Sequence, residues 1–155
     1  MNKISYIGHL RGEEPGDRPV GIIEDAPRHR PKDSPGEVVA MVRRGMPMAE
    51  FYALAGWLSV TEEELAPLVG ISRATLHRRK KTGQLEMLES ERIVRIGRLM
   101  ARATEVLGDL AAAREWLRTP AIAFRGESPL AYSDTEIGAR EVENLLGRLE
   151  HGVFS

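Results

Sequence analysis

The segment from Val60 to Gly83, VTEEELAPLVGISRATLHRRKKTG, constrains the fold more than any other part of the chain. Thr61 and Glu64 have the spacing of a capping box, in which each side chain satisfies a free amide at a helix start. Gly70 can supply the left-handed backbone conformation that ends a helix, and Ser72 can cap the next helix. A short helix, a glycine turn and a capped second helix are typical of a helix-turn-helix.

The second helix of this motif carries five formal positive charges within nine residues. A basic helix often has no role other than to face solvent. Here the spacings of the caps and the turn favour DNA binding instead. A recognition helix offers its N-terminal residues to base edges and its flanks to phosphates, so we expect Arg73, Thr75 and Arg78 near bases. For His77 alone, a surface residue without a ligand role is the better interpretation. The candidate DNA-binding residues are Arg73, Thr75, His77, Arg78, Arg79, Lys80 and Lys81, the last three being placed for phosphates.

The fold class predicted from periodicity is all-α. From Ser34 onward the apolar residues recur at helical spacing, and alternation with period 2 is absent except at 121–124. Aromatic residues make up only 5% of the chain, so the core must be aliphatic. We expect a long helix from Glu89 that Gly108 ends, a helix capped by Asp109, and a final helix capped by Asp134 or Thr135. The expected buried stripe of that final helix is Ile137, Val142, Leu145, Leu146 and Leu149.

The first 35 residues are predicted to be a flexible arm. Gly8–Gly36 contains ten Gly or Pro residues among charges of both signs, and such a stretch buries too little apolar surface to offset backbone ordering. Ile4–Ile7 could form a short extended segment. A plain unstructured leader is favoured over an arm that orders on a partner.

Composition excludes several classes of protein. The chain has no cysteine, which excludes disulfide scaffolds, thiol catalysis and cysteine-ligated zinc. The net charge of −1 excludes a protein that is basic overall, but a local basic patch suffices for nucleic acid. No apolar run could span a bilayer and no signal-peptide core is present, so we expect a cytoplasmic protein that does not bind membranes. Four scattered histidines and the lack of nucleotide-binding glycine loops predict no enzyme, catalytic residue, metal or cofactor.

Four strings in the second half resemble a known family: ESERIVRIGRL (Glu89–Leu99), AxxWLxxP (Ala113–Pro120), GESPL (Gly126–Leu130) and GAREVENLLGRLEHGV (Gly138–Val153). Together they resemble the toxin-binding domain of Xre/MbcA/ParS antitoxins, which partner RES-type toxins. The region 45–83 resembles the Xre-like helix-turn-helix found upstream of it. We therefore predict an arm over 1–35, an Xre-like helix-turn-helix and dimerisation domain over 36–88, and a toxin-binding domain over 89–155. One departure is Phe124-Arg125, where Leu-Gly is expected before Gly126.

The resemblance implies an antitoxin of a type II toxin–antitoxin system. Its helix-turn-helix would bind and repress its own operon as a homodimer on a palindromic operator. Its C-terminal domain would cover the active site of an NAD-degrading RES-domain toxin. The candidate toxin-binding residues are Glu127, Pro129, Glu150, Val153, Phe154 and Ser155.

The C-terminal tail has the charge to enter such an active site. A pocket that attracts a pyrophosphate should be electropositive, and residues 125–155 carry three arginines against six acidic residues, a net charge of −3. Val153 and Phe154 could anchor the tail while the Ser155 carboxylate accepts an arginine pair. The alternative is that Val153 and Phe154 fold back onto the protein's own core. For the GESPL turn, a structural corner and a toxin-binding surface remain equally open.

Two other functions are compatible with the sequence. The first is a stand-alone helix-turn-helix transcription regulator whose C-terminal domain only dimerises. A toxin gene in the neighbouring reading frame would favour the antitoxin. An RNA-binding regulator is weaker, because the basic segment lacks aromatic platforms for single-stranded bases.

Overall fold

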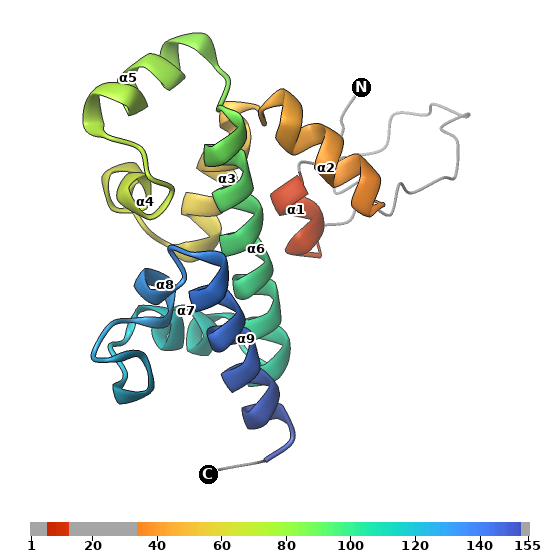
Figure 1. The fold of residues 1–155 in the computed structure, drawn as a ribbon, viewed down its shortest axis with the longest axis vertical. Coiled ribbons are helices and arrows are strands. Elements are labelled where there is room, and N and C mark those ends of the chain that lie inside the picture. Colours follow the sequence, from red (N-terminus) through yellow and green to blue (C-terminus); the bar gives the residue numbers. More distant parts are fainter. Residues whose placement is uncertain (1–5, 13–33, 153–155) are drawn as a thin grey trace, which may run out of the picture.

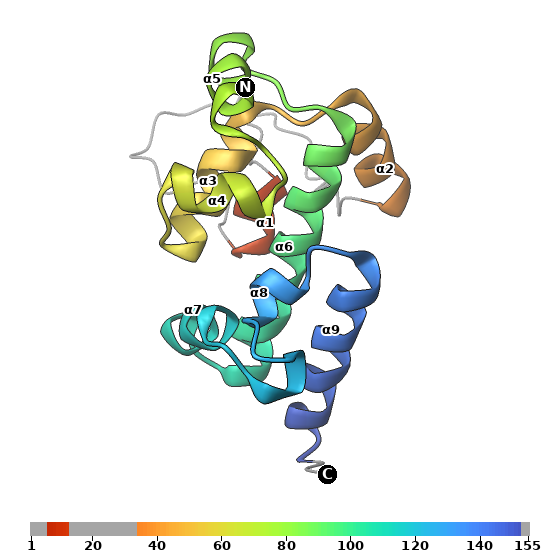
Figure 2. The same ribbon diagram turned by 60° about the vertical axis from the view of Figure 1, so that its left-hand side comes forward.

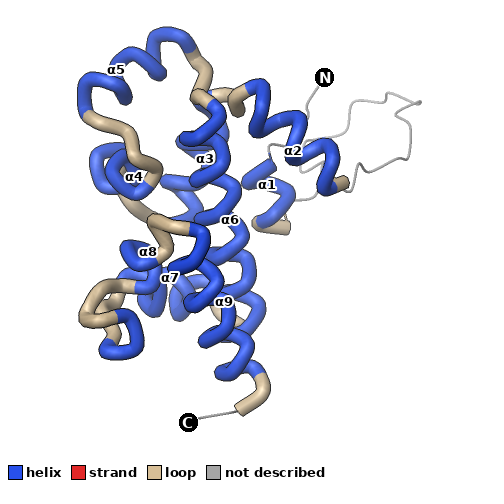
Figure 3. The backbone as a smooth tube through the Cα atoms, in the orientation of Figure 1, coloured by secondary structure: helices blue, strands red, loops and turns tan. Residues whose placement is uncertain are grey.

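The computed structural model describes residues 6–12 and 34–152, and these form helices joined by short loops (Figures 1 and 3). No β-strand occurs among these residues, so the all-α prediction is confirmed. The helices are α1 (Tyr6–Leu10), α2 (Pro35–Arg44), α3 (Met48–Leu58), α4 (Glu62–Leu68), α5 (Arg73–Thr82), α6 (Met87–Leu107), α7 (Leu110–Arg118), α8 (Pro129–Tyr132) and α9 (Glu136–Glu150), with a 3-10 helix η1 (Ile122–Phe124) between α7 and α8.

The long helix α6 is the axis of the molecule (Figures 1 and 2). Its first half packs against α2 and α3, and its second half packs against α7 and α9. Ile93, Leu99 and Ala103 lie along the helix and are fully buried. The predicted domain boundary at residues 88 and 89 falls in the first turn of α6, so the two predicted domains share one helix.

The predicted helix starts are confirmed where a short polar side chain accepts a hydrogen bond from a free backbone amide. The hydroxyl of Ser34 accepts from the Glu37 amide, and the hydroxyl of Thr135 accepts from the Gly138 amide at 3.0 Å. Thr135, rather than Asp134, is therefore the cap of α9. The long helix begins two residues before the expected Glu89, because the Glu89 carboxylate accepts the backbone amide of Glu86 and stabilises an earlier start.

Ile137 does not belong to the buried stripe of α9, which corrects the sequence prediction. Its side chain is 75% exposed, whereas Val142 and Leu146 are fully buried and Leu145 is partly buried. The reason is the neighbouring Gly138, which occupies the inward position in the first turn of the helix.

Helix α1 corrects the expectation of a free arm, as far as the structure describes that region. Tyr6 and Ile7 begin a helix rather than an extended segment, and Ile7 is fully buried against α3 and α6. A β-carbon on Gly97 of α6 would lie 2.9 Å from the Ile7 side chain, so this glycine lets α1 pack closely. The other arm residues, 1–5 and 13–33, lie outside the described part of the chain.

The buried carboxylate of Glu50 fixes the start of α1. It accepts the backbone amides of Tyr6 and Ile7 at 2.8 and 2.9 Å. We expect Glu50→Gln to weaken the docking of α1 by about 1–3 kcal/mol, because the amide group presents a donor where the helix start also has donors. Hydrogen exchange of the Ile7 amide should accelerate accordingly. The control is Glu64→Gln at the exposed capping box of α4, which should leave that exchange unchanged.

Candidate nucleic-acid interface and C-terminal domain

Helices α4 and α5 form the predicted helix-turn-helix. The Thr61 hydroxyl accepts the Glu64 amide at 3.1 Å, and the Glu64 carboxylate accepts the Thr61 amide at 2.8 Å, which completes the capping box. Gly70 has a φ of +75°, and Ile71 is buried in the turn. The Ser72 hydroxyl then accepts the Thr75 amide at the start of α5. A side chain at residue 70 would also collide with Arg92, whose guanidinium donates to the Val69 carbonyl at 3.2 Å.

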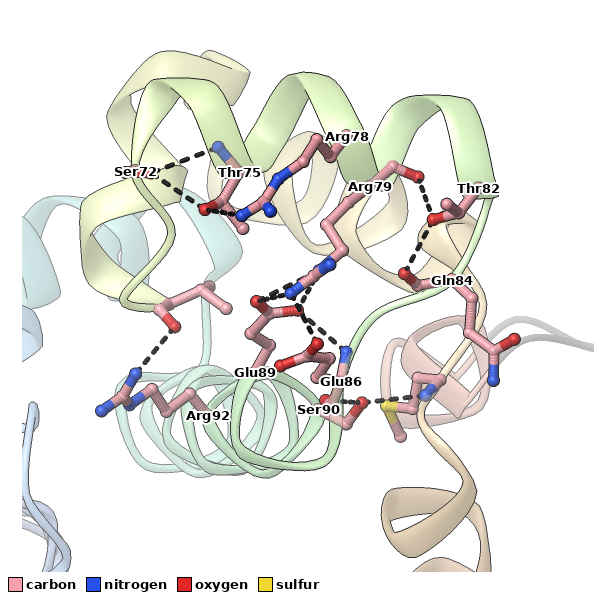
Figure 4. Close-up of polar contacts among 12 residues, drawn as sticks. Ser72, Thr75, Arg78, Arg79, Thr82, Gln84, Glu86, Glu89, Ser90 and Arg92 are labelled. Carbon is pink, nitrogen blue, oxygen red and sulfur yellow. Dashed lines mark hydrogen bonds and ion pairs between the residues drawn. The ribbon is translucent and has the colours of Figure 1, made fainter.

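Helix α5 has one buried side chain, Leu76, while Thr75 and Arg79 are partly buried and the remaining residues are exposed. Among the exposed residues are Arg73, His77, Arg78 and Lys81, as the sequence predicts. Thr75 is half-buried and its hydroxyl accepts a hydrogen bond from the Arg78 guanidinium at 3.1 Å (Figure 4). This contact orients Arg78 toward the N-terminal end of α5, the end that a recognition helix offers to base edges.

The sequence predicts that Arg79 faces a phosphate, but in the structure its side chain lies against α6. Its guanidinium forms a bidentate pair with the buried carboxylate of Glu89, at 2.9 and 3.0 Å, and also lies 3.1 Å from Glu86 (Figure 4). Only 14% of the Arg79 side chain is exposed. Arg79 therefore fastens α5 to α6 and is not free to bind a phosphate.

Lys80 is also engaged, although at the surface. Its ammonium pairs with the Glu62 carboxylate of α4, and the lysine side chain is 40% exposed. Exposed ion pairs contribute little to stability, so a DNA phosphate can replace this carboxylate at small cost. Among the predicted phosphate contacts, Lys81 is exposed and Lys80 becomes available by exchange.

The Glu89 carboxyl should make stability depend on pH. Burial alone would raise its pKa, but hydrogen bonds from the Arg79 guanidinium and the Glu86 amide more than offset this, and the pKa lies below its usual range. The anion therefore stabilises the fold above the unfolded-state pKa of about 4.3, and that contribution disappears as pH falls through the lower folded-state pKa.

We expect Glu89→Gln to lower the free energy of unfolding by about 1–3 kcal/mol at pH 7. Denaturant unfolding across pH 2–7 would measure this, and the variant should show a flatter acid dependence than the natural chain. Glu86→Gln is the matched control, since that carboxylate faces the same guanidinium but is 72% exposed; it should cost under about 0.5 kcal/mol. Equal losses in the two variants would contradict the role assigned to Glu89.

The C-terminal domain consists of α7, η1, α8 and α9 packed on the second half of α6 (Figure 2). The Asp109 carboxylate caps α7 by accepting the amides of Ala111 and Ala112, as the sequence predicts. Arg95 of α6 donates to the Asp134 carbonyl at 3.0 Å, at the loop before α9. The Arg102 guanidinium pairs with Glu150 at the other end of α9. Two arginines of α6 therefore hold both ends of α9.

The structure distributes the predicted toxin-binding residues unevenly. Glu127 is exposed, but Pro129 is buried at the first position of α8, where its fixed φ suits a helix start. Glu150 is exposed and its ion pair with Arg102 holds its pKa below the usual range. Pro129 therefore has a structural role at the start of α8. Val153, Phe154 and Ser155 lie outside the described residues.

The sequence alone assigns no role in these sites to Glu89, Gly138 or Arg125. Its position predicts only a helix start for Glu89, whose partner Arg79 lies ten residues away on another helix. Gly138 stands in one of the strings that carry the family resemblance, but only the structure gives its reason: a β-carbon there would lie 1.9 Å from the Tyr132 carbonyl oxygen. Arg125 has a φ of +56°, at the position where glycine was expected.

Residues 6–12 and 34–152 contain neither a metal-binding cluster nor a helix that could span a membrane. Within these ranges no group of three or more histidine, aspartate and glutamate side chains is arranged to hold a metal ion. None of the helices there is both long and apolar enough to cross a bilayer.

The geometry defines a helix-turn-helix protein with a second, helical domain built on the same long helix. Residues 37–98 match the family model of the antitoxin Xre-like helix-turn-helix domain, and residues 102–152 match that of the antitoxin Xre/MbcA/ParS C-terminal toxin-binding domain. The chain is 38% identical over 120 residues to "Antitoxin Xre" of Yersinia enterocolitica, an alignment that covers 76% of this chain and 81% of that relative. It is 31% identical over 127 residues to "Antitoxin Xre" of Photorhabdus laumondii, covering 81% and 86%.

The chain belongs to the Xre antitoxin family, of the Xre/MbcA/ParS type. It thus combines a DNA-binding helix-turn-helix with a toxin-binding domain, and it is an antitoxin of a toxin–antitoxin system.

Proposed function

We propose that this protein neutralises a RES-type, NAD-degrading toxin by covering its active site, and represses its own operon as a cytoplasmic homodimer. The observation that carries the proposal is the presence of both functional domains on one continuous helix, α6, with Arg73, Arg78 and Lys81 of α5 exposed at one end. The class of toxin comes from the family resemblance and from charge. An acidic C-terminal domain, with a net charge of −3 over residues 125–155, complements a pocket that binds a dinucleotide.

Repression follows from the exposed face of α5. Arg73 and Arg78, which are exposed, would contact base edges, and Lys80 and Lys81 would contact phosphates. A homodimer would present two such helices to a palindromic operator, with half-sites about one helical turn, roughly 34–36 Å, apart. If each half-site neutralised about four phosphates, the slope of log affinity against log salt would be about −3.6 per half-site.

Co-expression with the neighbouring reading frame tests the proposal. The neighbour's product alone should lower cellular NAD and stop growth, and expression of this chain should restore both. The two chains should co-purify, and this chain should bind the DNA upstream of its own gene. Promoter binding without any captured second chain would instead indicate a stand-alone regulator whose C-terminal domain only dimerises.

A shortened chain tests whether the tail enters the toxin pocket. Removal of residues 153–155 should leave the two chains bound to each other while NAD consumption resumes. Full neutralisation by the shortened chain would contradict the tail's role without affecting the rest of the proposal.

A further inference from the structure

The segment Ala121–Glu127 forms a closed corner between α7 and α8. The amide of Ala121 donates to the carbonyl of Glu127 at 3.0 Å, and the amide of Gly126 donates to the carbonyl of Ala121 at 3.0 Å. The single turn of η1 fills the space between them. The backbone of the corner is therefore fixed by its own hydrogen bonds.

One buried ring fastens this corner to the domain. Phe124 is only 2% exposed, and its ring centroid lies 5.1 Å from that of Tyr132 and 6.4 Å from that of Trp116. The buried ring and the backbone hydrogen bonds both hold the corner in place. The exposed side chains of the corner therefore project from a fixed backbone.

Ile122 is 98% exposed on this rigid corner, more than any other large apolar side chain in the described residues. Its neighbours in sequence are held by the turn, so the exposure does not come from a loose loop. A partner that buries Ile122 gains apolar contact and loses little conformational entropy, because the corner is already ordered.

Arg125 adds a charge to the same corner in a strained backbone conformation. Its φ and ψ are 56° and 31°, in the left-handed region that L side chains other than Asn and Asp rarely adopt. Glycine would remove this strain, and the side chain is exposed and forms none of the ion pairs found among the described residues. Strain of this kind persists where a side chain has a use, and arginine is enriched where binding energy concentrates at interfaces.

We propose that Ile122 and Arg125 form a contact point for the toxin, with Ile122 inserted into an apolar pocket and Arg125 paired with a carboxylate at its rim. The corner lies within residues 102–152, which match the toxin-binding domain. An electropositive substrate pocket would repel Arg125, so this contact lies on the toxin surface outside the active site. The inference depends on the proposed function for the existence of that toxin.

The test titrates the full-length chain against the purified product of the neighbouring reading frame by calorimetry. Ile122→Asp should raise Kd at least tenfold, Arg125→Gly about threefold to tenfold, and Ile122→Val less than threefold. Ile137→Asp is the matched control, because this isoleucine is 75% exposed in the same domain but on α9; its Kd should change less than twofold. All of these positions are exposed, and circular dichroism should show the natural helical content.

The outcomes separate the two proposals. No binding by the natural chain would overturn the proposed function. Binding by the natural chain that Ile122→Asp leaves intact would overturn only the contact point, and so would an equal loss in the Ile137→Asp control. A selective loss at Ile122, with Ile137→Asp unaffected, supports the contact point.

Discussion

Reversing two charges on α5, with Arg73→Glu and Arg78→Glu together, should lower affinity for operator DNA about 100-fold or more. A guanidinium that forks onto a guanine contributes roughly 1–3 kcal/mol, and the new carboxylates would also repel the phosphates. Arg78 is already oriented by its hydrogen bond to Thr75, so its loss removes a preorganised group. Fluorescence anisotropy with the DNA upstream of the gene, over a range of salt concentrations, measures both the affinity and the salt slope.

The matched control reverses two exposed arginines on α9, with Arg140→Glu and Arg148→Glu. Net charge changes by the same amount, but the substitutions lie on a different helix, in the other half of the molecule (Figure 1). Affinity for operator DNA should fall less than about threefold, because screened charges outside the interface contribute little. Similar losses in the two double variants would show that net charge, and not the face of α5, controls binding.

Gly138→Ala should destabilise the protein by about 2–4 kcal/mol, although alanine is ordinarily the better residue within a helix. The added methyl group would lie 1.9 Å from the Tyr132 carbonyl oxygen and 3.1 Å from its carbon, so α8 and α9 would have to separate. The melting temperature should fall by roughly 4–16 °C for a chain of this size. Toxin affinity should also fall, because the two helices belong to the toxin-binding domain.

Gly147→Ala on the same helix is the control for this prediction. Nothing lies within 4 Å of a β-carbon at residue 147, so the substitution should stabilise the protein by up to about 1 kcal/mol. Opposite signs for the two glycines, measured by denaturant unfolding, are the expected result. A neutral or stabilising Gly138→Ala would mean that α8 can move away from α9 without cost.

Local features of the fold were predictable from sequence, because their causes lie within a few residues. The capping box at Thr61 and Glu64, the glycine turn at Gly70 and the cap at Ser72 each depend on backbone groups no more than three residues away. These short-range contacts were enough to predict the helix-turn-helix and its exposed basic face.

Features that depend on tertiary contacts were not predictable in this way. The hydrogen bonds from the Tyr6 and Ile7 amides to the Glu50 carboxylate join residues more than forty positions apart. The pairing of Arg79 with Glu89 requires α5 to cross the start of α6, which no periodicity encodes. Ile137 has the spacing of a core residue and is nevertheless exposed, because close approach by the Tyr132 carbonyl requires Gly138 to face inward.

The uninterrupted length of α6 sets the distance between the helix-turn-helix and the far end of the C-terminal domain. At about 1.5 Å per residue, its 21 residues form a rod about 31 Å long. We therefore expect the toxin and the operator duplex to contact regions near opposite ends of this helix.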